Sequence, residues 1–334
     1  MWQPAAHGER PTTSDQRRTT NDHGRPILVT GAAGFAGSHL LDLLAADGGD
    51  LVAWRRPGGK PPRRVERVTW DAVDLLDRAA TFAAIARWRP RAVYHCAAAA
   101  HVGQAWEHSA DTFAVNVRGT HHLLEAVRRA SVDAVVLITS SAMVYQPSNE
   151  AIREDHALVP PNPYGLSKLA QELLALRAIG DAGDIRIARA FNHVGPRQDP
   201  SFAISGFARQ IAEIEAGGRA PEIVVGNLDA RREVTDVRDT VRAYRAVVDR
   251  GARGRPYNVS SGCAHAVGEI LERLTAKARV RVHVRVDPGR LRPNDVPLLV
   301  GDPTRIRAEL GWTPTIPLDR TLDDVLEYWR SQTR

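Results

Sequence analysis

The chain has 334 residues, of which 43% are hydrophobic and 25% are charged, and its formal net charge is +6. This length can form one large domain or two coupled domains. The basic residues are mostly arginines spread along the sequence, without a long basic run, so we expect no nucleic-acid partner. No apolar stretch approaches the length of a membrane helix, so we expect no membrane association. Because the two cysteines lie far apart with no metal-type spacing, we expect no metal site and a cytoplasmic location.

Residues 1–24 are polar and lack the apolar core of a signal peptide, which predicts a disordered N-terminal tail. The apolar run at 27–30 then enters a glycine-rich turn, and helical spacing follows from residue 38. Strand, glycine turn and helix in this order are typical of dinucleotide binding, because the glycines permit a tight turn and close approach of a pyrophosphate. The helix start offers unpaired N–H groups to the phosphates. The predicted cofactor contacts here are Gly31, Gly34, Phe35, Ala36 and Gly37.

The second predicted strand, at 51–54, ends at Arg55 and Arg56. A cofactor with a free ribose 2′-hydroxyl usually meets an acidic residue at this place, whereas arginine suits a 2′-phosphate. The sequence therefore favours NADP(H), with NAD(H) possible, and a solvated arginine pair is the alternative interpretation.

The next strands are predicted at 68–70 and 92–98, and a helix opens at Asn116. Asp74 follows the first of them and could reach the adenine amino group, while the small residues that end the second permit close approach of the nicotinamide half. The predicted cofactor contacts in this part are Asp74, Leu75, Ala97, Ala98 and Asn116.

The apolar run at 134–139 predicts a buried parallel strand that ends at Ser140 and Ser141, at the sheet edge where catalytic groups belong. Tyr164 and Lys168 are four residues apart, which places them on one face of a helix. A nearby ammonium favours the phenolate and lowers the pKa of a tyrosine, and Ser141 could hydrogen-bond the reacting oxygen. We predict Ser141, Tyr164 and Lys168 as catalytic residues, with Tyr164 and Lys168 also contacting the cofactor; a turn cap is the alternative for Ser141.

Strands and helices alternate from residue 25 to about 190, which predicts an α/β fold with a doubly wound parallel Rossmann sheet. We assign residues 25–191, with a returning segment at about 234–261, to the dinucleotide-binding domain. Residues 192–233 and 262–334 are assigned to a smaller C-terminal α/β substrate domain, which includes an amphipathic helix at 202–216.

These motifs together resemble the extended short-chain dehydrogenase/reductases that act on nucleotide sugars, over about residues 26–330. The matching residues are Thr30-Gly31-x-x-Gly34-Phe35-x-Gly37, Asn116-Val117-x-Gly119-Thr120, Ser141 and Tyr164-x-x-x-Lys168. Stretches 191–198, 226–232 and 292–296 resemble the GDP-mannose branch, which holds GDP-mannose 4,6-dehydratases and GDP-4-keto-6-deoxymannose reductases. The resemblance implies a nucleotide-sugar substrate and a homodimer, and it implies that the substrate is contacted by Asn192, Arg209, Arg232 and Arg292. Surface ion pairs are the alternative for the arginines.

The dehydratases carry acidic groups just after the catalytic serine or threonine, where this chain has Ala142 and Met143, which cannot transfer protons. The resemblance therefore implies NADPH-dependent reduction of the C4 ketone of a nucleotide-linked 4-keto-6-deoxyhexose, with GDP-4-keto-6-deoxymannose as favoured substrate and GDP-rhamnose as product. A nucleotide-sugar 4-epimerase with bound NAD and a 4,6-dehydratase are the alternatives. A non-catalytic regulator on the same fold is disfavoured because all three catalytic residues are present.

Overall fold

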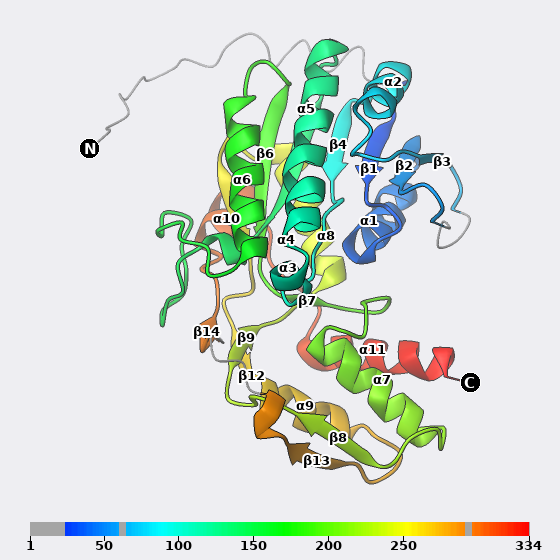
Figure 1. Ribbon diagram of the computed structural model, residues 1–334, viewed down its shortest axis with the longest axis vertical. Helices are drawn as coiled ribbons and strands as arrows, with labels where there is room; N and C mark the ends of the chain where they lie inside the picture. The colour runs from blue at the N-terminus through cyan, green and yellow to red at the C-terminus, as the bar shows by residue number, and fades with distance from the viewer. Residues whose placement is uncertain (1–23, 60–64, 291–295, 334) are drawn as a thin grey trace.

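The computed structural model describes residues 24–59, 65–290 and 296–333. Two predictions, the tail over residues 1–24 (apart from Gly24) and the substrate contact by Arg292, lie outside the described residues. The protein consists of a larger unit built on a central sheet and a smaller unit that lies past one end of its strands (Figure 1).

The central sheet has seven parallel strands in the order β11-β6-β5-β4-β1-β2-β3. The predicted doubly wound parallel sheet is thus confirmed. The order reverses between β1 and β4, and ligands of such sheets bind outside the carboxyl ends of the strands at this switch point. The strands are β1 (Ile27–Thr30), β2 (Leu51–Arg55), β3 (Val68–Ala72), β4 (Ala92–His95), β5 (Val135–Ser141), β6 (Asp184–Ala190) and β11 (Pro256–Val259).

Helices cover both faces of the sheet and enclose two apolar cores. One face carries α1 (Phe35–Ala46), α8 (Val237–Arg250) and α10 (Thr304–Leu310), and the other carries α2 (Arg78–Trp88), α5 (Gly119–Arg129) and α6 (Pro163–Arg177). On α1, Leu40, Leu41 and Leu44 are buried, as expected of the inward stripe of an amphipathic helix. Ile306 and Leu310 of α10 pack in the first of these cores, although residues 262–334 are predicted to belong to the smaller domain.

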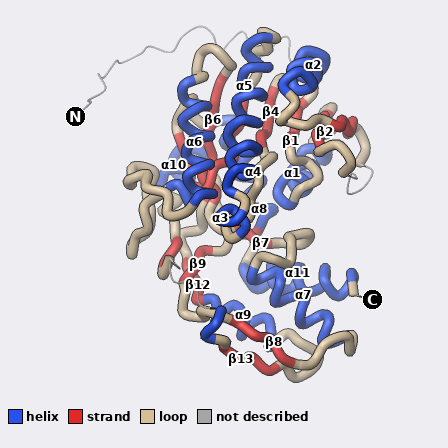
Figure 2. Tube along the Cα trace, in the orientation of Figure 1, coloured by secondary structure: helices blue, strands red, loops and turns tan. Residues whose placement is uncertain are grey.

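The smaller unit has its own core between three helices and a two-stranded sheet. Short strands connect it to the larger unit, as Figure 2 shows. Its helices are α7 (Ala203–Glu215), α9 (Val267–Ala276) and α11 (Leu318–Gln332), and its sheet pairs β8 (Glu222–Val225) with β13 (His283–Val286). The connecting strands are β7 (His193–Val194), β9 (Arg231–Glu233), β10 (Thr235–Asp236), β12 (Ala264–Ala266) and β14 (Leu298–Leu299).

Short helical segments follow β4 and β5 at the carboxyl edge of the sheet. They are α3 (Gln104–Glu107), α4 (Ser109–Phe113), the π-helical turn η2 (Ala114–Arg118) and the 3-10 turn η3 (Ala142–Val144), while a further 3-10 turn, η4 (Pro288–Arg290), lies in the smaller unit. None of the helices in the described part of the chain combines the length and apolarity needed to cross a bilayer.

Candidate active site

The glycine-rich turn between β1 and α1 needs residues without side chains. Gly31 has a φ of +64°, and a Cβ there would lie 2.6 Å from the Cα of Ala97, the residue predicted to approach the cofactor after β4. A Cβ on Gly37 would clash with the carbonyl oxygen of Gly31. Gly34 is the N-cap of α1, and among the described residues no side chain caps this end. The turn therefore keeps backbone N–H groups free at a helix start, which fits the pyrophosphate of a dinucleotide.

Arg55 ends β2, and β2 pairs with β1, so the predicted 2′-phosphate contact lies at the same edge as the glycine turn. The Arg55 guanidinium donates to the carbonyl oxygen of Gly59, while Arg56 is exposed. Asp74 accepts a bond from the backbone N–H of Leu76 at 2.9 Å, which forms a turn after β3. Leu75 packs beside Gly119, where a Cβ would lie 3.3 Å from the Leu75 Cβ.

Asn116 is buried and connects the loop after β4 to α6. Its Oδ1 accepts from the N–H of Ala99 at 2.8 Å, and its Nδ2 donates to the Oγ of Ser167 at 2.9 Å. The sequence predicted a helix opening at this residue; instead Asn116 lies in the π-helical turn η2, and α5 begins at Gly119. The widened turn aims the Asn116 amide at α6, so Asn116 supports the loop that carries Ala97 and Ala98.

Ser141 and Tyr164 are brought together from two elements. Ser141 ends β5, and Tyr164 lies in the first turn of α6, where Pro163 starts the helix and Asn162 caps it by accepting from the N–H of Gly165 at 2.8 Å. Burial raises the pKa of Tyr164, and a hydrogen bond with Ser141 opposes that rise only in part. Ser141 also accepts from the N–H of Met143 at 3.2 Å, which is the turn cap considered as its alternative role.

Lys168 lies one turn further along α6 and is 2% exposed. Burial lowers its pKa to about 8, although Cys96 and Glu172 act to raise it. The sequence analysis expected Lys168 to lower the pKa of Tyr164; in the structure that pKa lies above its ordinary value, because burial of the phenol outweighs its hydrogen bond. The phenol is therefore protonated at neutral pH, which is the form that a proton donor needs.

A buried ion pair fixes α6 to the sheet, and the sequence analysis missed it. Glu172 on α6 accepts from Arg189 on β6 at 2.8 Å and from the hydroxyl of Ser140 on β5. Arg189 also donates to the Tyr145 hydroxyl at 2.9 Å. An arginine within the apolar run of β6 was the signal that could have revealed this pair, since buried charges require partners.

Two predicted substrate contacts lie on segments that join the units. Asn192 follows β6 and is exposed, and its carbonyl accepts from the N–H of Thr235 at 3.0 Å. Arg232 lies on β9 and is partly buried. A third, Arg209, lies on α7 of the smaller unit. Its guanidinium pairs with Glu213 at 2.6 Å, which is the surface ion pair named as the alternative to substrate contact, and it lies over Trp329 on α11.

The glycine-turn helix also contacts the segment after β6. Phe35, predicted to bind cofactor, stacks on His193 with ring centroids 5.7 Å apart. His39, one turn later, meets the Pro196 carbonyl at 2.8 Å through Nε2 and Arg197 at 2.6 Å through Nδ1. This contact joins the helix after the glycine turn to the segment that leads into the smaller unit.

Two acids that precede Tyr164 in the chain are engaged elsewhere. Glu154 accepts from the N–H of Asn258 at 2.9 Å and lies 3.6 Å from Arg305, while Asp155 pairs with exposed Arg153 at 2.6 Å. Ala142 is buried in η3 directly after Ser141. The acid–base groups around Tyr164 therefore suit donation of one proton better than elimination.

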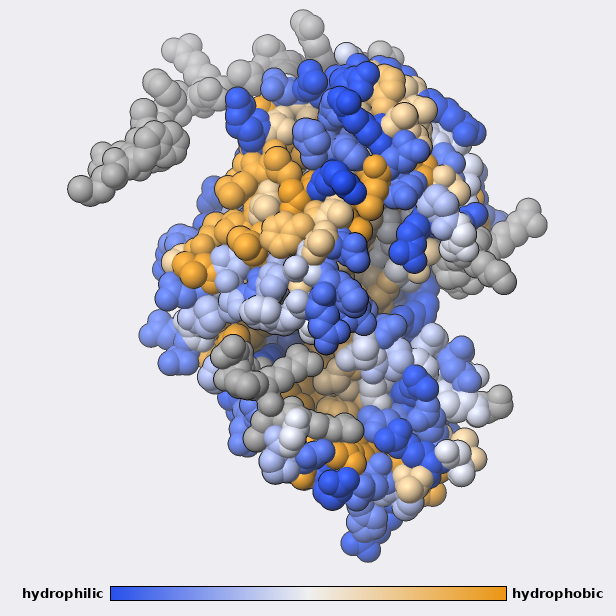
Figure 3. Space-filling model, in the orientation of Figure 1, coloured by the Kyte–Doolittle hydropathy of each residue, from blue (hydrophilic) through white to orange (hydrophobic). Residues whose placement is uncertain are grey.

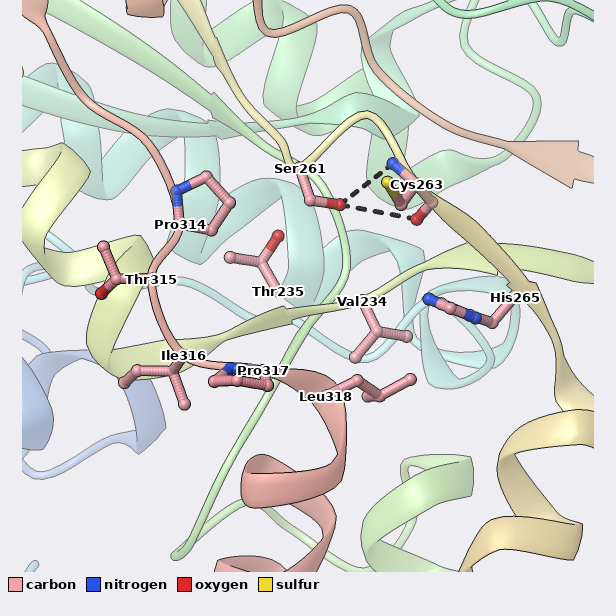
Figure 4. A pocket seen from close by; sticks show the side chains of 10 residues that line it. All are labelled: Val234, Thr235, Ser261, Cys263, His265, Pro314, Thr315, Ile316, Pro317 and Leu318. Atoms are coloured by element: carbon pink, nitrogen blue, oxygen red, sulfur yellow. Dashed lines mark hydrogen bonds between the residues drawn. The ribbon is translucent and has the colours of Figure 1, made fainter.

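A pocket of about 310 Å³ lies near the junction of the two units and contains none of the predicted site residues. Figure 4 shows Ser261 and Thr235 facing the chain segment at 316–318 across it. Its lining residues are Val234, Thr235, Ser261, Cys263, His265, Pro314, Thr315, Ile316, Pro317 and Leu318.

The chain is similar to known proteins over most of its length. The family model described as GDP-mannose 4,6 dehydratase matches residues 28–325. GDP-6-deoxy-D-mannose reductase of Pseudomonas aeruginosa is 34% identical, over 92% of this chain and 98% of that protein. UDP-glucose 4-epimerase of Mycolicibacterium smegmatis is 31% identical, over 92% of this chain and 99% of that protein.

Among solved structures, RMD from Pseudomonas aeruginosa complexed with NADPH superposes with a TM-score of 0.80 at 32% identity, covering 92% of this chain and 99% of that one. With this coverage, the likeness extends over both units. The chain therefore belongs to the GDP-mannose 4,6-dehydratase family, within the extended short-chain dehydrogenases/reductases that act on nucleotide sugars.

Proposed function

We propose that this enzyme reduces the C4 ketone of a nucleotide-linked 4-keto-6-deoxyhexose with NADPH, with GDP-4-keto-6-deoxymannose as substrate and GDP-rhamnose as product. The observation that carries the proposal is the placement of Tyr164, at the start of α6, beside Ser141, at the end of β5, with Ala142 and Met143 in the adjoining turn; desolvation raises the pKa of Tyr164, which favours its protonated form. Similarity to a GDP-6-deoxy-D-mannose reductase supports it.

Each catalytic side chain has one role in this reaction. Ser141 orients the ketone oxygen, Tyr164 gives that oxygen its proton, and the Lys168 ammonium stabilises the phenolate that remains. NADPH, when bound, supplies the hydride. Donation of a single proton makes fewer demands than elimination of a 6-hydroxyl, which needs a base at C5 and a second proton donor.

The chain's own residues fit NADPH at the switch point of the sheet. The turn at Gly31, Gly34 and Gly37 would hold the pyrophosphate, and Arg55 and Arg56 would face the 2′-phosphate from the end of β2. The relative solved with NADPH supports this choice. On the substrate side, we propose that Asn192 and Arg232 contact the sugar nucleotide, together with Arg292; arginine forks suit phosphate oxygens.

We further propose a homodimer that works in the cytoplasm. Figure 3 shows apolar side chains gathered over α6. Leu166 and Leu173, seven residues apart on α6, are 50% and 56% exposed. Two cysteines present as free thiols agree with a reducing compartment.

Two incubations test the proposed reaction. GDP-4-keto-6-deoxymannose with NADPH should consume cofactor and give a 6-deoxyhexose, because Tyr164 can protonate C4–O. GDP-mannose with NADP⁺ should give no keto sugar. Keto product in the second tube would favour a dehydratase, and failure of both, followed by interconversion of a UDP-sugar with retained NAD, would favour an epimerase.

A further inference from the structure

A buried chain of polar side chains runs from the strand before the glycine turn to the catalytic lysine. Thr30 contacts His95 Nδ1 at 2.8 Å, and His95 Nε2 contacts Thr120 Oγ1 at 2.8 Å. Gln171 Nε2 donates to Thr120 Oγ1 at 2.7 Å, and Lys168 Nζ donates to Gln171 Oε1 at 2.7 Å. Apart from Lys168, at 2%, each of these side chains is fully buried.

The hydrogens of this chain have one assignment that gives every polar atom its partner. An ammonium only donates, so the oxygen of Gln171 must face Lys168 and its amide nitrogen must donate to Thr120. The Thr120 hydroxyl donates to the Asn116 carbonyl at 2.7 Å, so it presents lone pairs to both Gln171 and His95.

It follows that His95 is neutral and carries its hydrogen on Nε2. Its Nδ1 then accepts from the Thr30 hydroxyl, whose own lone pair accepts from the N–H of Ala97 at 3.2 Å. Burial agrees, because it lowers the pKa of His95 to about 3, with the charge of Lys168 acting in the same direction.

We propose that Gln171 is a positioning residue that holds the Lys168 ammonium through a neutral acceptor, and that His95, through Thr120, keeps the Gln171 amide in the required orientation. This bond occupies one of the three N–H groups of Lys168 and leaves two for the reacting side. Because the acceptor is uncharged, the ammonium keeps its full positive charge for stabilising the Tyr164 phenolate. The role in catalysis rests on the function proposed above.

The groups facing Lys168 leave its charge largely uncompensated. Glu172, the next acid on α6, is paired with Arg189. Cys96, directly after β4, has its pKa raised to about 12 by burial, and Tyr244 on α8, which interacts with Cys96 and Tyr164, has its pKa raised mainly by burial. Because burial lowers the pKa of His95 and raises those of Cys96 and Tyr164, titration of Lys168 near pH 8 can be followed by itself.

The test measures the pKa of Lys168 directly and needs no substrate. The chain has three lysines, Lys60, Lys168 and Lys277, so the full-length protein labelled with ¹³C-lysine gives three side-chain signals. The Lys168 signal is assigned by its loss in Lys168→Met. Lys277, paired with Asp323 at 2.7 Å, reports on intact folding.

Gln171→Met should lower the pKa of Lys168, because the ammonium loses its acceptor, and Gln171→Glu should raise it, because a carboxylate favours the charged form; we expect about one unit in each direction. Gln210→Glu on α7 is the matched control and should leave it unchanged. Shifts of the same sign, or none in the near-isosteric Gln171→Glu, would overturn the proposal whatever the enzyme reduces.

Two substitutions of His95 test its role in orienting the Gln171 amide. His95→Gln can still donate near the Nε2 position and should keep the pKa of Lys168, whereas His95→Asn reaches only the Nδ1 position and should lower it as Gln171→Met does. Equal effects of the two would remove His95 from the arrangement. If the titrations behave as expected but no 4-keto sugar is reduced, the proposed reaction fails and the positioning role stands.

Discussion

Tyr164 is the residue on which the proposed reaction depends most directly. Tyr164→Phe removes the proton donor but keeps the ring that packs beside Ser141, so turnover should fall about a hundredfold to ten-thousandfold while cofactor and sugar nucleotide still bind. Steady-state kinetics with a binding titration check this, and Tyr328→Phe on α11 should behave as the unaltered protein. A kcat near normal in Tyr164→Phe would show that another group is the acid.

Arg55 and Arg56 decide the cofactor preference if they contact the 2′-phosphate. Replacing both with alanine removes the interactions with that phosphate, which NADH lacks, so KM should rise far more for NADPH than for NADH. The control Arg128→Ala changes an exposed arginine at the end of α5. Equal changes for the two cofactors would disprove the contact.

For single residues, the sequence predicts the positions of those that belong to a local motif. It does not predict interactions that depend on tertiary contacts. Ser141 and Tyr164 lie close together because a strand end and a helix start are adjacent in this fold, and Lys168 lies one turn further along the same helix. The bond from Lys168 to Gln171 depends on Thr120 from another helix, and the engagement of Arg209 depends on Trp329, 120 positions away, so no local pattern shows either.

Between elements, the contact of α1 with the segment after β6 should make stability depend on pH. Burial lowers the pKa of His39 to about 4 from the ordinary 6.5, with Arg197 acting in the same direction and the Pro196 carbonyl opposing. Because the folded state favours the neutral imidazole, the contribution of His39 to the free energy of unfolding is complete above pH 6.5 and is lost as the pH falls toward 4.

Urea denaturation of the protein and of His39→Gln across this range isolates the effect. The difference in unfolding free energy should shrink as the pH falls from 6.5 to 4, by about 1.4 kcal/mol for each unit of pKa difference. Burial raises the pKa of Glu233 to about 7, so this residue also affects stability in this pH range. It is present in both proteins, and its contribution therefore cancels in the comparison. A difference that stays constant with pH would contradict the assignment of His39.

Helices and strands could be predicted from the sequence where one hydrophobic pattern dominated. The apolar run at 134–139 became a strand, and it extends to Ser141 because each residue to that point pairs with β6. The π-helical turn at Asn116 had no such signal, since its extra residue is fixed by the bonds of Asn116 to Ala99 and Ser167.

For the whole molecule, the alternation of elements predicted the sheet, while the division into domains stays a prediction. The strand β11 lies in the segment at about 234–261 that was expected to return to the larger unit, and it pairs with β6 there. The packing of α10 on the larger core was not expected, because its seven residues carry too short a pattern to show which unit they cover.

The proposed homodimer makes the last prediction. Leu166 and Leu173 lie on the face of α6 opposite Tyr164, and apolar side chains this exposed at one helical face favour self-association. A C2 contact would bury both copies of the stripe at once. The double variant Leu166→Glu with Leu173→Glu should therefore sediment as a monomer at micromolar concentration, with its far-ultraviolet circular dichroism unchanged.

The control is the double variant Val284→Glu with Val286→Glu. These two valines on β13 are also exposed, and their substitution should leave the dimer intact. Dissociation by the β13 pair and not by the α6 pair would move the interface to the smaller unit.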